Sequence, residues 1–415
     1  MDKVNTLKLR IVTLVLGCTL LISGCSTISD WFADDEELAV RRLVPIESQF
    51  SPSIAWSTEL GNGIAQYYSR LEPALAYGKV YAANRQGLVA AYEQKTGEKV
   101  WEHNFAIYPE DEWFPWLTRM LSKGEPAKIS GGVSIAYETV FLGTENGEVI
   151  ALDAKNGEVK WQTMVKGEVI AAPSVEEGVV VLNTGSGMVF ALDANSGEQL
   201  WMYESDVPPL SLRGVSSPAA TAGGAIIGTA NGKLVVNILA TGQTAWEQVI
   251  SSASGVTELD RIVDIDSQPL VSAGTIYVIT YDGSLAAVEL RTGRIIWKRE
   301  YKSYRRLTVA GNNLFVVDAN SNVYALDSRN GVELWSQGAL KKRQLTSAVP
   351  VGDYLVAGDK WGYLHWFNQS DGKLVARLAV GDDDEDESIY TSPVVEGNTL
   401  YTQTRDGKLV AVTTP

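Results

Sequence analysis

The stretch Gly147–Trp161, GEVIALDAKNGEVKW, decides the fold of this chain. From Val149 to Ala154 successive side chains alternate between two faces, as they do in a half-buried strand. Lys155–Gly157 then supplies a tight turn, with glycine where a positive φ is expected. Val159 and Trp161 begin the return strand. The stretch is therefore predicted to be a β-hairpin.

The same hairpin recurs along the chain, which makes eight copies in all. The other seven run over Gly87–Trp101, Gly187–Trp201, Gly232–Trp246, Gly283–Trp297, Asn322–Trp335, a copy from Gly362 with Ala376 in the tryptophan's place, and a truncated GKLVAV from Gly407. Their first residues lie 39 to 60 positions apart, mostly about one propeller-blade length. Two further apolar runs precede most hairpins, as in Ala172–Thr184 and Ser392–Thr404.

Each repeat is therefore predicted to hold four short strands, A to D, with the hairpin forming C and D. A lone sheet of this kind cannot cover both apolar faces, so the copies must pack face to face around an axis. We predict an all-β fold, an eight-bladed β-propeller with four-stranded antiparallel blades. The alternative is a sandwich of unrelated hairpins, which eight registered copies disfavour.

The N-terminal strand is predicted to close the ring. The last copy lacks a D strand, whereas Ser53–Leu60, SIAWSTEL, resembles a D strand without a blade. Pairing the two would hide both open sheet edges. Seven tryptophans then occupy one equivalent position between blades: Trp56, Trp101, Trp161, Trp201, Trp246, Trp297 and Trp335.

The sequence before the propeller is typical of a bacterial lipoprotein. A basic n-region (Lys3, Lys8, Arg10) precedes a largely apolar run of twelve residues, 11–22, and the segment ends in LISGC at Cys25. We expect residues 1–24 to be a lipoprotein signal peptide, 25–52 a lipidated tether and 53–415 the propeller. By resemblance to the sorting rules of diderm bacteria, Ser26 after the cysteine implies delivery to the outer membrane. The alternative is an ordinary signal peptide followed by a chance cysteine.

Cysteine count and charge narrow the possible functions. Cys18 leaves with the signal, so the mature chain keeps only Cys25 and has no internal disulfide. The signal carries +2, from three basic residues and one acidic, so the whole chain's −15 becomes −17 after its removal. Such an acidic protein is unsuited to bind nucleic acid or anionic lipid. Attachment to a membrane would then come from the lipid.

The unequal spacings place insertions between a D strand and the next A strand. The first insertion, 102–129, contains Trp113, Trp116, Leu117, Met120 and Leu121 at helical spacing. We expect a short amphipathic helix, and the sequence leaves open whether it packs on the rim or meets a partner. An acidic run at Gly381–Ser388 lacks the ligand spacing of a calcium loop and is expected to be a solvated loop.

The second and third insertions, 204–216 and 250–267, carry the candidate site. DVPPLSLRG displays Leu210, Leu212 and Arg213, and TELDRIVDID contains Asp264 and Asp266. The insertions belong to adjacent crossings and should be neighbours on one rim, where Asp264 or Asp266 would orient Arg213. This composition is typical of a small protein-binding patch. The alternative is an internal Arg–Asp latch between blades.

The ALDxxxGxxxW repeats resemble those of quinoprotein alcohol dehydrogenases, a resemblance that covers the mature chain but implies only the fold. Together with LISGC and the loops DVPPLSLRG and TELDRIVDID, the chain resembles the BamB family, lipoproteins of the outer-membrane β-barrel assembly machinery. That resemblance implies that Leu210, Leu212, Arg213, Asp264 and Asp266 bind a periplasmic domain of the barrel-forming subunit BamA. The first insertion is longer than is usual in the family.

We therefore expect a non-catalytic scaffold that faces the periplasm and assists folding and insertion of outer-membrane β-barrel proteins. No cofactor or metal is expected. A quinoprotein site usually uses a vicinal disulfide, which one cysteine cannot form, and His103 and His365 have no second histidine at metal-ligand spacing. The alternative is a ligand-binding or sensory propeller that uses its central funnel. Direct contact with nascent barrel proteins, for example by strand addition at a blade edge, stays open.

Overall fold

The computed structural model describes residues 35–108, 124–381, 383 and 385–415. Residues 46–415 form one compact unit, and the preceding unit contributes helix α3, Asp35–Arg41. Nowhere in these ranges does a helix have the length and hydropathy needed to cross a bilayer. The predicted helix at Trp113–Leu121 and the lipidation motif at Cys25 lie outside the described residues.

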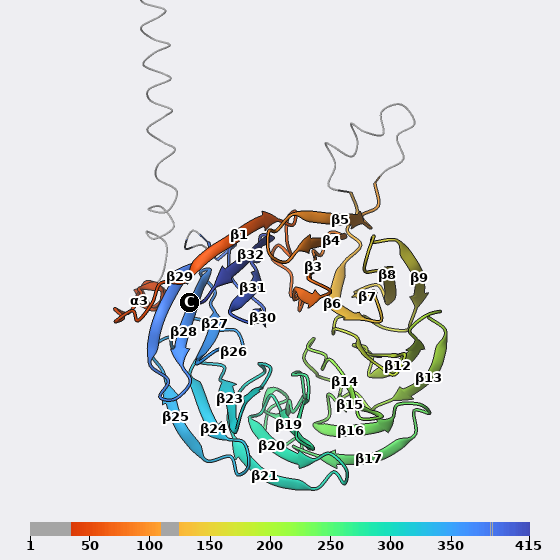
Figure 1. The fold of residues 1–415 in the computed structure, drawn as a ribbon. Coiled ribbons are helices and arrows are strands. Elements are labelled where there is room, and N and C mark those ends of the chain that lie inside the picture. The colour runs from red at the N-terminus through yellow and green to blue at the C-terminus, as the bar shows by residue number, and fades with distance from the viewer. Residues whose placement is uncertain (1–34, 109–123, 382, 384) are drawn as a thin grey trace, which may run out of the picture. The chain divides into compact units, whose positions relative to one another are not determined.

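Residues 46–415 form a ring of eight four-stranded antiparallel sheets, which confirms the predicted propeller (Figure 1). The first four blades are β2–β5 (Ala74–Ala76, Lys79–Ala83, Leu88–Glu93, Lys99–Asn104), β6–β9 (Ile129–Ala136, Thr139–Thr144, Glu148–Asp153, Val159–Met164), β10–β13 (Ser174–Glu176, Val179–Asn183, Met188–Asp193, Gln199–Glu204) and β14–β17 (Ala219–Thr221, Gly224–Gly228, Lys233–Ile238, Thr244–Val249). The next three are β18–β21 (Leu270–Ser272, Thr275–Ile279, Ser284–Glu289, Ile295–Glu300), β22–β25 (Thr308–Ala310, Asn313–Val317, Val323–Asp327, Glu333–Gln337) and β26–β29 (Val349–Val351, Tyr354–Gly358, Tyr363–Asn368, Leu374–Ala379). The eighth is β30–β32 (Val394–Glu396, Thr399–Gln403, Lys408–Thr413) with β1 (Ser53–Glu59).

The N-terminal strand closes the ring, as predicted. Strand β1 pairs antiparallel with the C-terminal strand β32, from Ser53 opposite Thr413 to Glu59 opposite Lys408. The chain already contacts the propeller before β1 begins. The Gln49 N–H donates to Val375 O at 2.9 Å, and the Phe50 ring lies 4.6 Å from that of Tyr354. Part of the segment expected to be a tether therefore packs on blade seven.

The core lies between blades rather than within any one of them. Each pair of neighbouring blades shares a cluster of buried apolar side chains, and these clusters continue around the ring to the contact between blades eight and one. Middle strands B and C are almost wholly buried, whereas D strands alternate, as in the pattern eeBeie of β9. Hence no blade can be stable without both neighbours.

The repeated tryptophan joins each blade to the next. In seven blades the D-strand indole N–H donates to a carbonyl in the C–D turn of the following blade, at 2.7 to 3.0 Å. The ring also covers that turn's glycine, as Trp101 covers Gly157. A Cβ at any of these glycines would lie 2.4 to 2.8 Å from the indole, and their φ angles are 69° to 75°. Only glycine satisfies both constraints.

Blade seven inverts this arrangement. Elsewhere the tryptophan sits on the D strand opposite a small C-strand residue, such as Ala151 opposite Trp161. In blade seven Trp366 is on the C strand and Ala376 is opposite it on the D strand. The following blade has no C–D turn, because its C and D strands come from opposite ends of the chain. Trp366 instead donates to Thr414 Oγ1 at 3.0 Å. The alanine at position 376 is thus explained by how the ring closes, and not by loss of the repeat pattern in this copy.

We predict that Trp366→Ala lowers the free energy of unfolding by about 3–5 kcal/mol, because Trp366 is fully buried. Adding Ala376→Trp should not restore stability, since the next blade offers no turn glycine or turn carbonyl. Chemical denaturation of both variants measures this, with Trp297→Ala in blade five as the comparison for loss of an ordinary D-strand tryptophan. A double variant as stable as the wild type would contradict the explanation.

Candidate partner-binding site on the rim

The second and third insertions lie side by side, as the sequence predicts. They join β13 to β14 and β17 to β18, and the Leu212 backbone N–H donates to Asp264 Oδ2 at 2.8 Å. Asn183, at the end of β11, secures the first of them by donating to Ser216 O at 3.1 Å. The D–A crossings and the B–C turns therefore share one rim.

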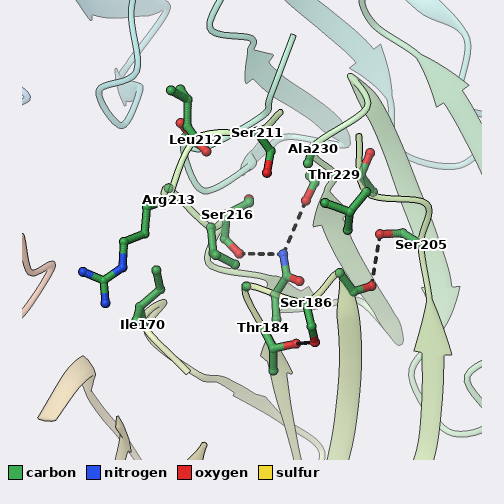
Figure 2. Close-up of a pocket in the computed structure, with 18 of the residues that line it drawn as sticks. Ile170, Thr184, Ser186, Ser205, Ser211, Leu212, Arg213, Ser216, Thr229 and Ala230 are labelled. Carbon is green, nitrogen blue, oxygen red and sulfur yellow. Dashed lines mark hydrogen bonds between the residues drawn. The ribbon is translucent and has the colours of Figure 1, made fainter. Parts of the chain in front are cut away.

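A pocket of about 430 Å³ opens between these crossings (Figure 2). Ile170, Ala171 and Val215 form a small buried apolar cluster beside it. Hydroxyl groups of the B–C turn line another side, where Thr184 Oγ1 and Ser186 Oγ are 3.0 Å apart. Leu212 and Arg213 stand on the loop at the pocket and their side chains leave it in different directions (Figure 2). We call this cavity the rim pocket.

Both predicted aspartates are buried rather than displayed. Asp264 is 1% exposed, and its Oδ1 has no hydrogen-bond partner among the described residues. Burial raises the pKa of Asp264 to about 7, against the lowering effect of the Leu212 N–H, and the charge of Asp266 adds to the rise. Burial also raises the pKa of Asp266, which Arg70 opposes. The Asp266 carboxylate lines the rim pocket and lies so close to Gly214 that a Cβ there would be 2.4 Å from its Cγ.

Arg213 is not oriented by Asp264 or Asp266, and that prediction is wrong. Its guanidinium contacts Glu168 at 3.3 Å and Glu145 at 3.4 Å. Asp264 is occupied by the Leu212 N–H, and alternation along the loop turns the next side chain the other way. The alternative of an internal Arg–Asp latch is therefore not found between these residues, and the crossings are joined through a backbone N–H.

Glu145 connects Arg213 to the first blade. Its carboxylate accepts two hydrogen bonds from Arg85, at 2.8 and 2.9 Å. Burial acts to raise the pKa of Glu145, but hydrogen bonds and charge from Arg85 and Arg213 hold it below its ordinary value. Sequence reasoning missed this network, although both glutamates occupy the same rim: Glu145 in a B–C turn and Glu168 in a D–A crossing.

Exposed apolar side chains occur on both insertions. Leu210 is 42% exposed and Leu212 is half-buried. On the third insertion Val256 is 99% exposed and Leu259, which begins the 3₁₀ turn Leu259–Arg261, is 71% exposed. Val256 and Leu259 were not among the predicted site residues. The sequence offered one sign of their exposure, because both are apolar residues in an insertion that has neither strand nor helix periodicity.

Asp264→Asn should remove a pH dependence of stability. A folded-state pKa of about 7, raised from 3.8, means that the proton's stabilising effect is complete below about pH 4 and is lost as pH rises through 7. Asparagine stays uncharged and can still accept from Leu212. We expect its Tm to exceed that of the wild type at pH 8 and the difference to vanish by pH 4, on a scale of about 1.4 kcal/mol per pKa unit.

Thermal unfolding between pH 4 and 8 measures the effect. Asp327→Asn is the control. Hydrogen bonds from Arg329 hold the pKa of Asp327 at about 2, so this group titrates below the range measured and the Tm difference between Asp327→Asn and the wild type should stay nearly constant from pH 4 to 8. A wild type and Asp264→Asn with parallel profiles would contradict the expected titration.

Comparison with known proteins gives consistent matches over nearly the whole chain. A family model described as outer membrane protein assembly factor BamB matches residues 85–337 and 320–414. The BamB protein of Alteromonas naphthalenivorans is 53% identical over 405 residues, covering 98% of this chain and 97% of the relative. That of Escherichia coli is 44% identical over 399 residues, covering 96% and 97%.

Solved structures agree. The crystal structure of BamB from Moraxella catarrhalis matches with a TM-score of 0.75 at 28% identity, covering 88% of this chain and all of that one. A quinohemoprotein alcohol dehydrogenase from Comamonas testosteroni matches with a TM-score of 0.65 at 14% identity, covering 90% and 78%, a likeness of fold alone. On its sequence and its fold, this chain belongs to the BamB family of outer membrane protein assembly factors.

Proposed function

We propose that this chain is a non-catalytic scaffold lipoprotein of the β-barrel assembly machinery, which binds periplasmic domains of BamA and assists folding and insertion of outer-membrane β-barrel proteins. The observation that carries the proposal is the union of two insertions into one surface at a single rim, through the bond from Leu212 N to Asp264. Relatives over nearly the full length are named as outer membrane protein assembly factors, which supports the same role.

The five predicted residues divide into two groups in this proposal. Leu210, Leu212 and Arg213 offer surface to the partner, with half of the Arg213 side chain exposed. Asp264 and Asp266 hold the loop from beneath. Exposed Leu210 with Val256 and Leu259 supplies apolar contact area, and an arginine beside it is a frequent interface anchor. We call Leu210, Leu212, Arg213, Asp264 and Asp266 the rim patch.

The donor set at the axis does not fit a metal-bound quinone. The cavity there is lined by three arginines and one glutamate, and Glu72 is already paired with Arg306 at 3.2 Å. Among the described residues no group of three histidine, cysteine, aspartate or glutamate side chains could hold a metal ion.

Arg213→Glu should weaken binding to a BamA periplasmic fragment by about thirtyfold, the loss of a hot spot worth about 2 kcal/mol. The introduced carboxylate would face Glu145 and Glu168 and repel the partner group that Arg213 meets. The pair Leu210→Ala with Leu212→Ala should lose a similar amount. Binding is measured by interferometry and Tm is measured on the same samples.

Arg329→Glu is the matched control, an exposed arginine in the C–D turn of blade six. Restoring the local ion pair with Arg213→Glu and Glu168→Arg should recover Tm but not affinity, because the partner still lacks its guanidinium. If Arg213→Glu unfolds at a lower temperature yet binds BamA normally, the rim patch is an internal latch and the proposed interface is wrong.

We place the protein at the outer membrane, facing the periplasm and held by lipid on Cys25, with residues 1–24 as signal and 25–52 as a tether whose end, at Gln49 and Phe50, packs on blade seven. Cys25→Ala should leave the chain unprocessed or soluble in the periplasm. Fractionation with mass measurement of the N-terminus tests this, and Cys18→Ala is the control within the signal. A Cys25→Ala protein that fractionates with the outer membrane as firmly as the wild type would refute lipid anchoring at this residue.

A further inference from the structure

A second cavity, of about 440 Å³, lies on the axis of the ring. All eight blades contribute to its lining, through the residues that lead into or begin their A strands. Tyr68 and Tyr304 are both partly exposed there. Its volume falls in the range of about 300–1,000 Å³ typical of small-ligand sites. We call it the axial cavity.

The charge of the axial cavity is opposite to that of the protein. Arg70, Arg305 and Arg306 line it with a single carboxylate, Glu72, which leaves a local charge of +2 in a chain of net charge −15. Glu72 pairs with Arg306. Arg70 and Arg305 have no carboxylate within salt-bridge distance among the residues that the structure describes.

The two remaining guanidiniums are held in place but not saturated. Arg70 Nε donates to Tyr68 Oη at 2.6 Å, and its Nη1 donates to the carbonyls of Val215 and Asp266 at 2.9 and 2.5 Å. Arg305 lies 4.7 Å over the Tyr304 ring, and its guanidinium makes one long bond, 3.4 Å, to Gln344 O. Each guanidinium has five N–H donors, which is more than the number of acceptors that it meets here.

Placing these arginine side chains close together costs free energy, and a bound anion would remove that cost. Burial lowers the pKa of the Arg305 guanidinium; Tyr304 and Tyr68 oppose that shift, and the positive charge of Arg70 adds to it. Like charges placed together in a partly desolvated cavity repel each other, and a shared counter-charge relieves both. Guanidinium forks pair bidentately with carboxylates and phosphates.

We infer that the axial cavity is a binding site for a small polyanion bearing carboxylate or phosphate groups, held by Arg70 and Arg305 beside Tyr68 and Tyr304. The inference goes beyond the scaffold function and does not depend on it. The site needs neither a metal nor any partner residue. It differs from the rim patch in both position and charge.

Isothermal titration calorimetry on the processed chain tests the site with two probes, tricarballylate and inorganic phosphate. The wild type should bind at least one of them with sub-millimolar affinity that falls as salt is raised. Arg305→Gln should weaken that binding by about tenfold or more, equivalent to one strong charge-assisted contact. Arg294→Gln, an exposed arginine in the blade-five C–D turn, should leave it unchanged.

The two probes distinguish the sources: tighter tricarballylate identifies a carboxylate ligand, and tighter phosphate a phosphoryl ligand. Arg70→Gln is a second variant, with Tm recorded because Arg70 also bonds two rim carbonyls. Absence of heat from the wild type with both probes, or equal weakening in Arg305→Gln and Arg294→Gln, would overturn the inference. BamA binding should be unaffected by Arg305→Gln, because Arg305 lies outside the rim patch, so the two proposals can fail separately.

Discussion

The fold depends on the stacking of one tryptophan on one glycine, repeated between neighbouring blades. Hydrophobic burial alone would hold blades together without fixing their register, since apolar contacts are not directional. The indole N–H fixes the register, because it reaches a single carbonyl in the next blade's turn. The glycine lets the ring approach where any Cβ would collide. Loss of either residue therefore affects two blades at once.

That constraint also explains how much of the fold the sequence could predict. Tryptophan and turn glycine are fixed by contact geometry, so six of the eight copies retain both residues and the blades can be counted from the repeat. The meaning of Ala376 could not be predicted in the same way. It follows from the absence of a C–D turn in the next blade, a property of the closed ring, and the buried Trp366 opposite it carries the compensation.

The sequence could predict which loops form the candidate site, but not which side chains pair with each other there. Spacing placed the two insertions on adjacent crossings, and the bond from Leu212 to Asp264 joins them. Spacing cannot choose among carboxylates that approach from other blades. Glu145 and Glu168, which contact Arg213, are contributed by earlier parts of the ring and lie outside both insertions. Asp264 and Asp266 were expected at the surface, but both are buried. A buried aspartate can still support a binding surface by ordering the backbone of the loop that carries that surface.

This ordering gives the rim patch its rigidity. Asp264 fixes Leu212 from one side, and Asn183 fixes Ser216 from the strand below. Arg70 bonds the carbonyls of Val215 and Asp266 from the axis. Two buried side chains, Asp264 and Asn183, and the half-buried Arg70 thus hold two loops that have no regular secondary structure of their own over most of their length. A loop held in this way loses less conformational entropy on binding than a free one. In this acidic propeller, an arginine at the axis therefore helps to order the loops of the rim. Because the loops are ordered, they can expose apolar side chains without folding over to bury them.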